Sequence, residues 1–520
     1  MNIIKKSILW SVMAAAGLSM TSCDSFLKEF SQDLAKVTSW EDLDEVLLGD
    51  AYVASCRLTL DDDDDEAGQN WDILHVMTDE LKLMPAYSTD VLDYEANMFA
   101  FITWQQDTGI DKLFKYVGKD ESYFNDLYRR INVCNMVLAL IDEQPAPHRE
   151  DELAKERVKG EAYYLRGVYY FMLANLYCPP YNPATASKEM GMPLKFTEYI
   201  EDTEYTRASL EDTYKTIIDD LKNAVELLKG KSRKSIYHAN SIAAELLLSR
   251  IYLYMQDWTN AALYAQSVID QQPDLLDLRS IQSGQNSVSA SSPETIFSMG
   301  DYAVSALTAD NRGSLESSFP QWLISDEMMA MYASNDLRNG RYVGQTQIRR
   351  ERGAFLKVDG QRRAWGPMYD VGSVFLMRTP EAYLTLAEAS AYSGDNGKAQ
   401  EILAQFLKYR MSGSTSVNKT GNDLIEFIRD ERAREFLLEG HRWFDLRRYT
   451  VNQVYPWSKE IVHAYPYDAD YNFSYYDYYR LEKNDPAYTL PLPRSVRNFQ
   501  ISLGSVERPV RVKIEAPEED

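Results

Sequence analysis

Apolar residues recur every three or four positions along most of this chain, which is the spacing of one face of an α-helix. The clearest runs are 123–141 and 158–177, and the second ends at Pro179-Pro180. Helix-start patterns, with a capping residue three positions before an acid, occur at Thr38-x-x-Glu41 and at Ser209-x-x-Asp212, which opens a helix through Leu228. A start with proline at the first helical position occurs at Thr379-Pro380-Glu381. These patterns predict a mainly α fold.

Two segments, 243–273 and 386–407, share a pattern of small residues. In each segment a small residue of the first predicted helix precedes an alanine of the second by the same step: Ser249 and Ala261, then Ala387 and Ala399. Small residues let paired helices approach closely, and the spacing resembles the tetratricopeptide pattern. We therefore expect a tetratricopeptide-like helical-repeat scaffold.

Helical periodicity fades in two places. Residues from about 275 to 374 are rich in Ser, Gly, Asn and Asp, over a length too great for a simple connection. We expect this stretch to be a loop-rich elaboration of the scaffold with a functional role. A second segment, 455–479, carries many tyrosines among acids and is expected to be irregular and to form an ordered surface.

The first residues predict export and lipid attachment. Lys5 and Lys6 precede an apolar run, 8–18, which is too short to span a bilayer and is typical of a signal-peptide core. Ser22 directly before Cys23 supplies the small side chain that a lipoprotein-processing peptidase accepts, and the Cys23 thiol would take the lipid.

We therefore expect a lipoprotein signal peptide at 1–22 and a single domain at 23–520, tethered through acyl chains on Cys23. The alternative is a plain secretory signal in which Cys23 is incidental. No other apolar run in the sequence is long enough to span a membrane.

Composition and charge limit the classes of partner that the chain can bind. The chain has 520 residues, 45% of them hydrophobic, so it can bury a large core. Its formal charge is −24, or −26 once Lys5 and Lys6 leave with the signal, which repels nucleic acid and anionic lipid. The cysteines that remain beside Cys23 are too few for a disulfide framework, and Cys134 fits a small core residue.

Residues 422–448, NDLIEFIRDERAREFLLEGHRWFDLRR, predict a helix from about Asp423 to Glu439 that ends at Gly440. Acids and arginines alternate at helical spacing, which places Asp430 one turn from Arg434 and Asp445 one turn from Arg448. We expect a partly buried charge network that fixes how two helices meet.

This segment closely resembles the SusD/RagB family of surface nutrient-binding lipoproteins, whose late helix carries an ERA-R-E-…-EGHRWFDLRR motif. Further blocks that resemble the family are 23–27, 38–52, 160–177, 191–194, 209–221, 243–254, 293–297 and 378–389. Residues 488–498 (YTLPLPRSVRN) resemble the terminal motif of the family, with Arg494 and Ser495 as departures. The resemblance therefore covers nearly the whole chain.

The resemblance implies a tetratricopeptide-like scaffold on the outer face of a Gram-negative outer membrane. Family members hold oligosaccharide, or peptide in the RagB branch, and cap a SusC-like TonB-dependent transporter. By the same resemblance the ligand face lies on loops of the N-terminal part and of the middle elaboration.

Within those regions the candidate ligand-binding rings are Tyr87, Tyr94, Trp104, Trp322, Tyr342 and Trp365. An exposed ring can stack on the C–H face of a sugar, although each of these rings also fits core packing. Candidate polar partners for sugar hydroxyls are Asn311, Arg312 and Asp326.

The sequence contains no H-E-x-x-H, G-x-S-x-G, G-x-x-x-x-G-K-[ST] or G-x-G-x-x-G motif, and its histidines lack zinc-ligand spacing. Acidic runs at 61–66 and 468–472 depart from the calcium-binding EF-hand loop and are interpreted as solvated loops. The three acids Glu431, Glu435 and Glu439 alternate with arginine, which favours structural pairing over catalysis. We expect no cofactor and no metal.

Three hypotheses remain. The preferred one is a non-catalytic, lipid-anchored protein that captures oligosaccharide or polysaccharide and delivers it to the transporter. The second is the same scaffold binding peptides. The third is a surface glycoside hydrolase, which would need a pair of carboxylates across a cleft.

Overall fold

The computed structural model describes residues 37–53, 71–84, 97–199, 204–231, 234–282, 285–300, 322–346, 352–358, 370–466 and 476–517. The predicted signal peptide, Cys23 and both acidic runs lie outside these residues. Cys134 is fully buried, as predicted.

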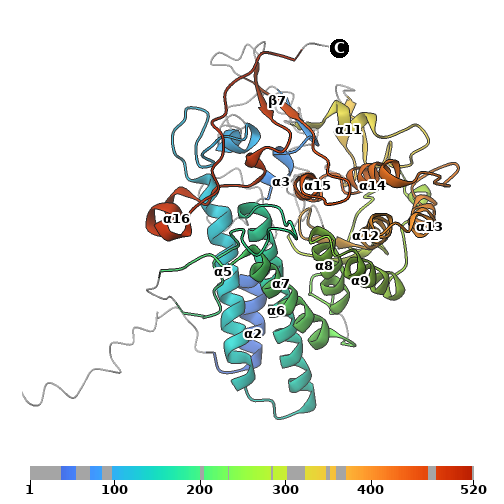
Figure 1. Cartoon of the computed structure of the whole chain (residues 1–520). Helices are drawn as coiled ribbons and strands as arrows, with labels where there is room; N and C mark the ends of the chain where they lie inside the picture. The colour runs from blue at the N-terminus through green and yellow to red at the C-terminus, as the bar shows by residue number, and fades with distance from the viewer. Residues whose placement is uncertain are drawn as a thin grey trace, which may run out of the picture.

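The described part is mainly α-helical, as predicted, and short strands complete it (Figure 1). The helices are α2 (Trp40–Val46), α3 (Ile73–Val76), α5 (Lys119–Leu140), α6 (Arg149–Tyr177), α7 (Leu210–Leu228), α8 (Ser241–Tyr254), α9 (Trp258–Gln271), α11 (Asp326–Ala330), α12 (Thr379–Tyr392), α13 (Asn396–Leu407), α14 (Gly421–Glu435), α15 (Arg442–Thr450) and α16 (Arg494–Phe499). Single turns are η1 (Leu47–Ala51), η2 (Ile141–Glu143), η3 (Leu278–Ser280), η5 (Pro486–Tyr488) and η6 (Ile501–Leu503). Across the described ranges, none of these helices combines the length and apolar character that crossing a membrane requires.

Each sheet in the described ranges consists of two antiparallel strands. The pairs are β1 (Leu81–Leu83) with β3 (Trp322–Ile324), β2 (Thr295–Ser298) with β6 (Leu376–Arg378), β4 (Val343–Gln345) with β5 (Arg352–Phe355), and β7 (Ile461–Pro466) with β8 (Tyr476–Leu481). Such short ribbons are marginal alone, so they depend on packing against the helical part.

The long helices α5, α6 and α7 lie side by side and form the lower part of the molecule in Figure 1. α6 meets α7 closely because Gly160 and Gly167 face leucines of α7: an added Cβ at Gly160 would lie 2.8 Å from Leu228 Cγ. The buried Arg166 guanidinium of α6 donates to both carboxylate oxygens of Asp220 in α7, at 2.8 and 2.7 Å. Close packing and a two-point ion pair together set the position of α7 on α6.

The two helix pairs that the small residues predict are α8 with α9 and α12 with α13. Ser249, Ala261, Ala387 and Ala399 are all fully buried, as expected of residues at close helix contacts. The prediction of a tetratricopeptide-like scaffold is confirmed.

The three helix-start patterns agree with the observed starts to within one residue, whereas the predicted runs 123–141 and 158–177 begin inside α5 and α6, which start at Lys119 and Arg149. Ser209 caps α7 as predicted, since its hydroxyl accepts from the backbone N–H of Asp212. In α2 the cap is Ser39 rather than the predicted Thr38, because the Asp42 carboxylate closes the capping box with Ser39. In α12, Thr379 is the first helical residue rather than the cap.

The tyrosine-rich segment 455–479 is not irregular throughout, in contrast to the prediction. Its described ends form the hairpin strands β7 and β8. Alternate residues of β7 are buried, and the Tyr465 and Tyr479 rings pack against Phe99 with centroid distances of 5.1 and 5.8 Å. The apolar contact with Phe99 explains why this segment forms a strand, because burial of alternate residues on one face favours a strand.

Gly160→Ala is expected to lower the free energy of unfolding by about 1–3 kcal/mol, because the added methyl group overpacks the contact of α6 with α7. Gly49→Ala is the control, since nothing lies within 4 Å of its added Cβ. Urea unfolding followed by circular dichroism measures both. Equal stability of the two variants would contradict the close approach of α6 and α7.

Candidate ligand-binding site

Two regions expected to carry the ligand face, the N-terminal part and the middle segment (about 275–374), lie side by side. β1 pairs with β3 in the register Leu81 with Ile324 and Leu83 with Trp322. Beside this ribbon, the Ser325 hydroxyl donates to the Asp79 carbonyl at 2.6 Å. The structure thus joins chain segments about 240 residues apart, as the ion pair of Lys82 with Asp326 spans 244 positions.

The predicted ligand ring of Trp104 is a core residue. Its side chain has no exposed surface, its indole N–H donates to the Met77 carbonyl at 3.0 Å, and its ring stacks on His463 at 4.3 Å. Because both the edge and a face of the indole are taken by the protein, the ring has no surface left for a sugar.

Trp322 and Tyr342 are also core residues, with exposed fractions of 1% and 0%. The Tyr342 hydroxyl donates to Glu435 Oε1 at 3.2 Å, and the Lys357 ammonium lies 4.5 Å from the centre of its ring. The prediction that Trp104, Trp322 and Tyr342 stack on ligand is therefore wrong in this structure, because buried rings have no free face.

Among the residues that the structure describes, no other predicted ligand residue is found in the core. Tyr87, Tyr94, Trp365, Asn311 and Arg312 lie outside the described residues. Asp326 is exposed at the start of α11, where both carboxylate oxygens accept from the Lys82 ammonium at 2.9 Å.

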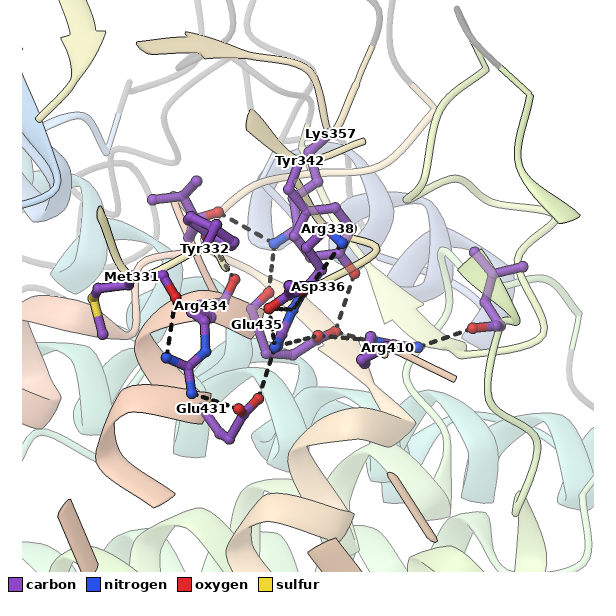
Figure 2. Close-up of polar contacts among 12 residues, drawn as sticks. Met331, Tyr332, Asp336, Arg338, Tyr342, Lys357, Arg410, Glu431, Arg434 and Glu435 are labelled. Carbon is purple, nitrogen blue, oxygen red and sulfur yellow. Dashed lines mark hydrogen bonds and ion pairs between the residues drawn. The ribbon is translucent and has the colours of Figure 1, made fainter. Parts of the chain in front are cut away.

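A buried charge network joins the middle segment to the end of α14 (Figure 2). We call it the Glu435 network. Its cations are Arg338, Lys357, Arg378, Arg410 and Arg434, and its acids are Glu294, Asp336, Glu431, Glu435 and Glu439. Each of these cations contacts at least one of these acids, so the charges compensate one another away from water.

Glu435, the last residue of α14, is the centre of the network. Its carboxylate accepts from Arg410 Nε at 2.8 Å and from Arg378 Nη1 at 3.1 Å. Burial alone would raise the pKa of Glu435, but the charges of Arg410 and Arg378 outweigh it and hold this pKa far below its ordinary value. Glu435 therefore joins β6 and the segment after α13 to α14.

The end of α14 also holds the middle segment. The Arg338 guanidinium donates to Glu431 and to Asp336, both at 2.8 Å. The buried Lys357 ammonium donates to the Glu435 carbonyl at 2.6 Å and pairs with Glu439. Burial lowers the pKa of Lys357 to about 8, while the charge of Glu439 acts in the opposite direction.

The helix ends earlier than the predicted Glu439. After Glu435 the chain turns, with positive φ angles of 55° at Leu438 and 76° at Gly440. Gly440 tolerates this backbone without strain, whereas Leu438 is held in it by its N–H, which donates to the buried Glu80 carboxylate at 2.9 Å. The turn points Glu439 to Arg378, whose Nη2 donates to it at 2.7 Å.

A second charge cluster joins α14 to α15 and α12. Arg432 donates to Asp445 at 2.9 Å, and Arg448 bonds both Asp445 at 2.7 Å and Glu388 at 2.6 Å. The predicted pair of Asp445 with Arg448 is confirmed. Arg434 pairs with Glu431, at 2.5 Å, rather than with the predicted Asp430. Burial raises the pKa of Asp430, and the charge of Arg434 acts in the opposite direction.

These ion pairs agree with the interpretation that the three glutamates have a structural role. Glu431, Glu435 and Glu439 are each enclosed by cations and lie inside the core, where they bind other parts of the chain. Sequence reasoning found these acids but missed Glu294, Arg338 and Arg410, because nothing local links an acid to a partner far along the chain. In the described part of the chain, no three His, Cys, Asp or Glu side chains are arranged to hold a metal ion.

Arg410→Met is expected to lower the free energy of unfolding by about 3–5 kcal/mol, because it leaves the buried charge of Glu435 less compensated. Arg279→Met is the matched control: this arginine pairs with Asp277 but is 56% exposed, so its loss is expected to leave the free energy of unfolding nearly unchanged. Chemical denaturation measures both values. Similar values for the two variants would show that the network does not stabilise the fold.

Two family models match the chain. Residues 73–253 match a model described as "Starch-binding associating with outer membrane", and residues 333–502 match the model of the SusD family. A curated SusD-like protein of Bacteroides ovatus is 22% identical over 378 residues, which are 64% of this chain. The alignment spans 66% of that relative, just under two thirds of its length.

Solved structures share the fold. A SusD superfamily protein of Bacteroides thetaiotaomicron superposes with a TM-score of 0.67 at 18% identity, over 91% of this chain and 100% of its own. A SusD-like carbohydrate binding protein of Bacteroides vulgatus gives 0.65 at 20% identity, over 90% and 98%. A laminarin binding SusD-like protein gives 0.61 at 19% identity, over 91% and 100%. The two models, both of SusD-like proteins, together match more than half of the chain, so the chain belongs to the SusD family.

Proposed function

We propose that the chain is a cell-surface lipoprotein that binds oligosaccharide or polysaccharide without altering it and delivers it to a SusC-like TonB-dependent transporter. The observation that carries the proposal is the match of residues 73–253 to the starch-binding, outer-membrane-associating family. The names of the carbohydrate-binding and laminarin-binding relatives support the same ligand class. In this proposal residues 23–520 act as one domain, with the elaboration at about 275–374 contributing to the ligand face.

The geometry supports the proposal because a rigid scaffold holds the loops that would contact the ligand. The β1–β3 ribbon brings the N-terminal and middle segments together, and the Glu435 network fixes the middle segment on the helical part. A binding face on loops gains affinity when a rigid scaffold orders it in advance. Because Trp104, Trp322 and Tyr342 are buried, the ring-stacking role falls to Tyr87, Tyr94 and Trp365.

A panel of polysaccharides in affinity electrophoresis is expected to show retardation of the mature protein by at least one glycan, with no product released. The triple variant Tyr87→Ala/Tyr94→Ala/Trp365→Ala is expected to bind that glycan at least about tenfold more weakly, because each ring contributes apolar contact area. Tyr199→Ala, which removes an exposed ring elsewhere, is the control and is expected to bind as the wild type does.

Other outcomes of that experiment decide against the proposal. Retention of peptides with no retention on any glycan would favour the peptide-binding alternative. Release of shortened oligosaccharides would favour a glycoside hydrolase. Unchanged affinity of the triple variant would assign the ligand contacts to other side chains.

The anchor is tested separately. Cys23→Ala is expected to abolish incorporation of an alkyne-labelled fatty acid and to release the protein from the outer-membrane fraction, because the acyl chains on this thiol provide the attachment. Cys56→Ala is the matched control and is expected to keep both label and location. Label retained in the Cys23 variant would show that acylation occurs elsewhere.

A further inference from the structure

A cavity of about 670 Å³ is lined by none of the predicted ligand residues. Its walls come from α5, from the segment that follows Gly191, and from the C-terminal elements α16 and η6. Figure 1 shows α16 beside α5 at the edge of the molecule. The volume falls in the range of small-molecule sites, roughly 300–1,000 Å³.

The floor of the cavity is a set of aromatic rings held in place by other contacts. Phe124 and Tyr128 of α5 lie with ring centroids 4.8 Å apart, and Phe124 meets Tyr177 edge to face at 5.4 Å. The Tyr128 hydroxyl donates to the Pro193 carbonyl at 2.8 Å, which fixes the ring. The floor is therefore preformed, and a ligand does not have to order it.

The charged residue of the wall, Lys195, already binds other groups. Its ammonium donates to Asn132 Oδ1 and to the Tyr199 carbonyl, both at 2.9 Å. The Gln500 side-chain oxygen accepts from the backbone N–H of Tyr205 at 2.9 Å. Ser495 and Asn498 also line the cavity, but its exposed lining is mainly apolar. With Lys195 and Gln500 engaged within the protein, the wall favours a ligand with little charge and few hydroxyl groups, unlike a glycan.

The outer wall of the cavity, formed by α16, exposes apolar surface to solvent. α16 has no buried side chain, and the ring of Phe499 is 87% exposed at the edge of the cavity. The helix is attached at its start, where Arg494 Nε donates to Asp107 at 3.1 Å and its guanidinium lies 4.2 Å from the Tyr116 ring centre. A flat apolar ligand between Phe499 and the floor rings would remove this surface from water.

We propose that this cavity binds an uncharged aromatic molecule of one or two rings. The size of the cavity, its preformed aromatic floor and its mainly apolar lining all fit that class. The proposal goes beyond glycan capture and does not depend on it, since the two sites share none of the residues that carry them.

The test titrates the mature protein with N-phenyl-1-naphthylamine, an uncharged fluorophore that brightens in apolar surroundings. Saturable binding with one site per chain is expected. Val496→Trp is expected to weaken binding roughly tenfold or more, because the indole fills the cavity from α16, and Phe499→Ala about threefold or more through lost ring contact. Ile501→Ala is the matched control, because Ile501 is 82% exposed and lies on η6, outside the lining.

Thermal melting followed by circular dichroism shows whether each variant folds. If Val496→Trp does not fold, the affinity of Phe499→Ala carries the test. Absence of saturable fluorescence with the wild type would overturn the proposal, as would equal affinity of the wild type and Phe499→Ala. A glycan found by electrophoresis is expected to leave the fluorophore bound, so failure of either site is seen independently of the other.

Discussion

The pairing of Glu435 with Arg410 and Arg378 is the constraint on which the rest of the architecture depends. A buried carboxylate without a cation costs several kcal/mol, so every element that supplies a partner must arrive in one arrangement. The partners come from the segment after α13, from β6 before α12 and, through Arg338, from the middle segment. An apolar contact of the same size would let these elements slide past one another, whereas hydrogen-bonded ion pairs hold them in one register.

That constraint explains how a helical-repeat scaffold carries an irregular face. The strands β1 to β6 are too short to be stable alone, and the Glu435 network and the turn after α14 attach them to the helices. Loops on such a base can differ between members of a family while the scaffold stays the same. This accounts for TM-scores of 0.61 to 0.67 at sequence identities of only 18 to 20%.

The molecule offers two chemically different kinds of surface. The face where the N-terminal and middle segments meet has exposed charge, such as Asp326, above a core of buried rings. The cavity under α16 instead presents aromatic rings in a mainly apolar lining, in which the Tyr128 hydroxyl and the Gln500 oxygen are already engaged. A glycan needs partners for many hydroxyl groups and suits the first kind of surface, while an uncharged ring suits the second.

The sequence by itself determined the helices of the scaffold, because helical spacing, the Ser209 cap and the small residues Ser249 and Ala261 act within a few turns of chain. The family was indicated by the motif at 422–448. Only the tertiary structure decided which aromatic rings are exposed and which cations meet Glu435. Trp104 has the same local signature whether it faces solvent or packs on His463, whose position lies more than 350 residues away. Burial and ion pairing are properties of contacts between distant segments, so the local pattern did not contain them.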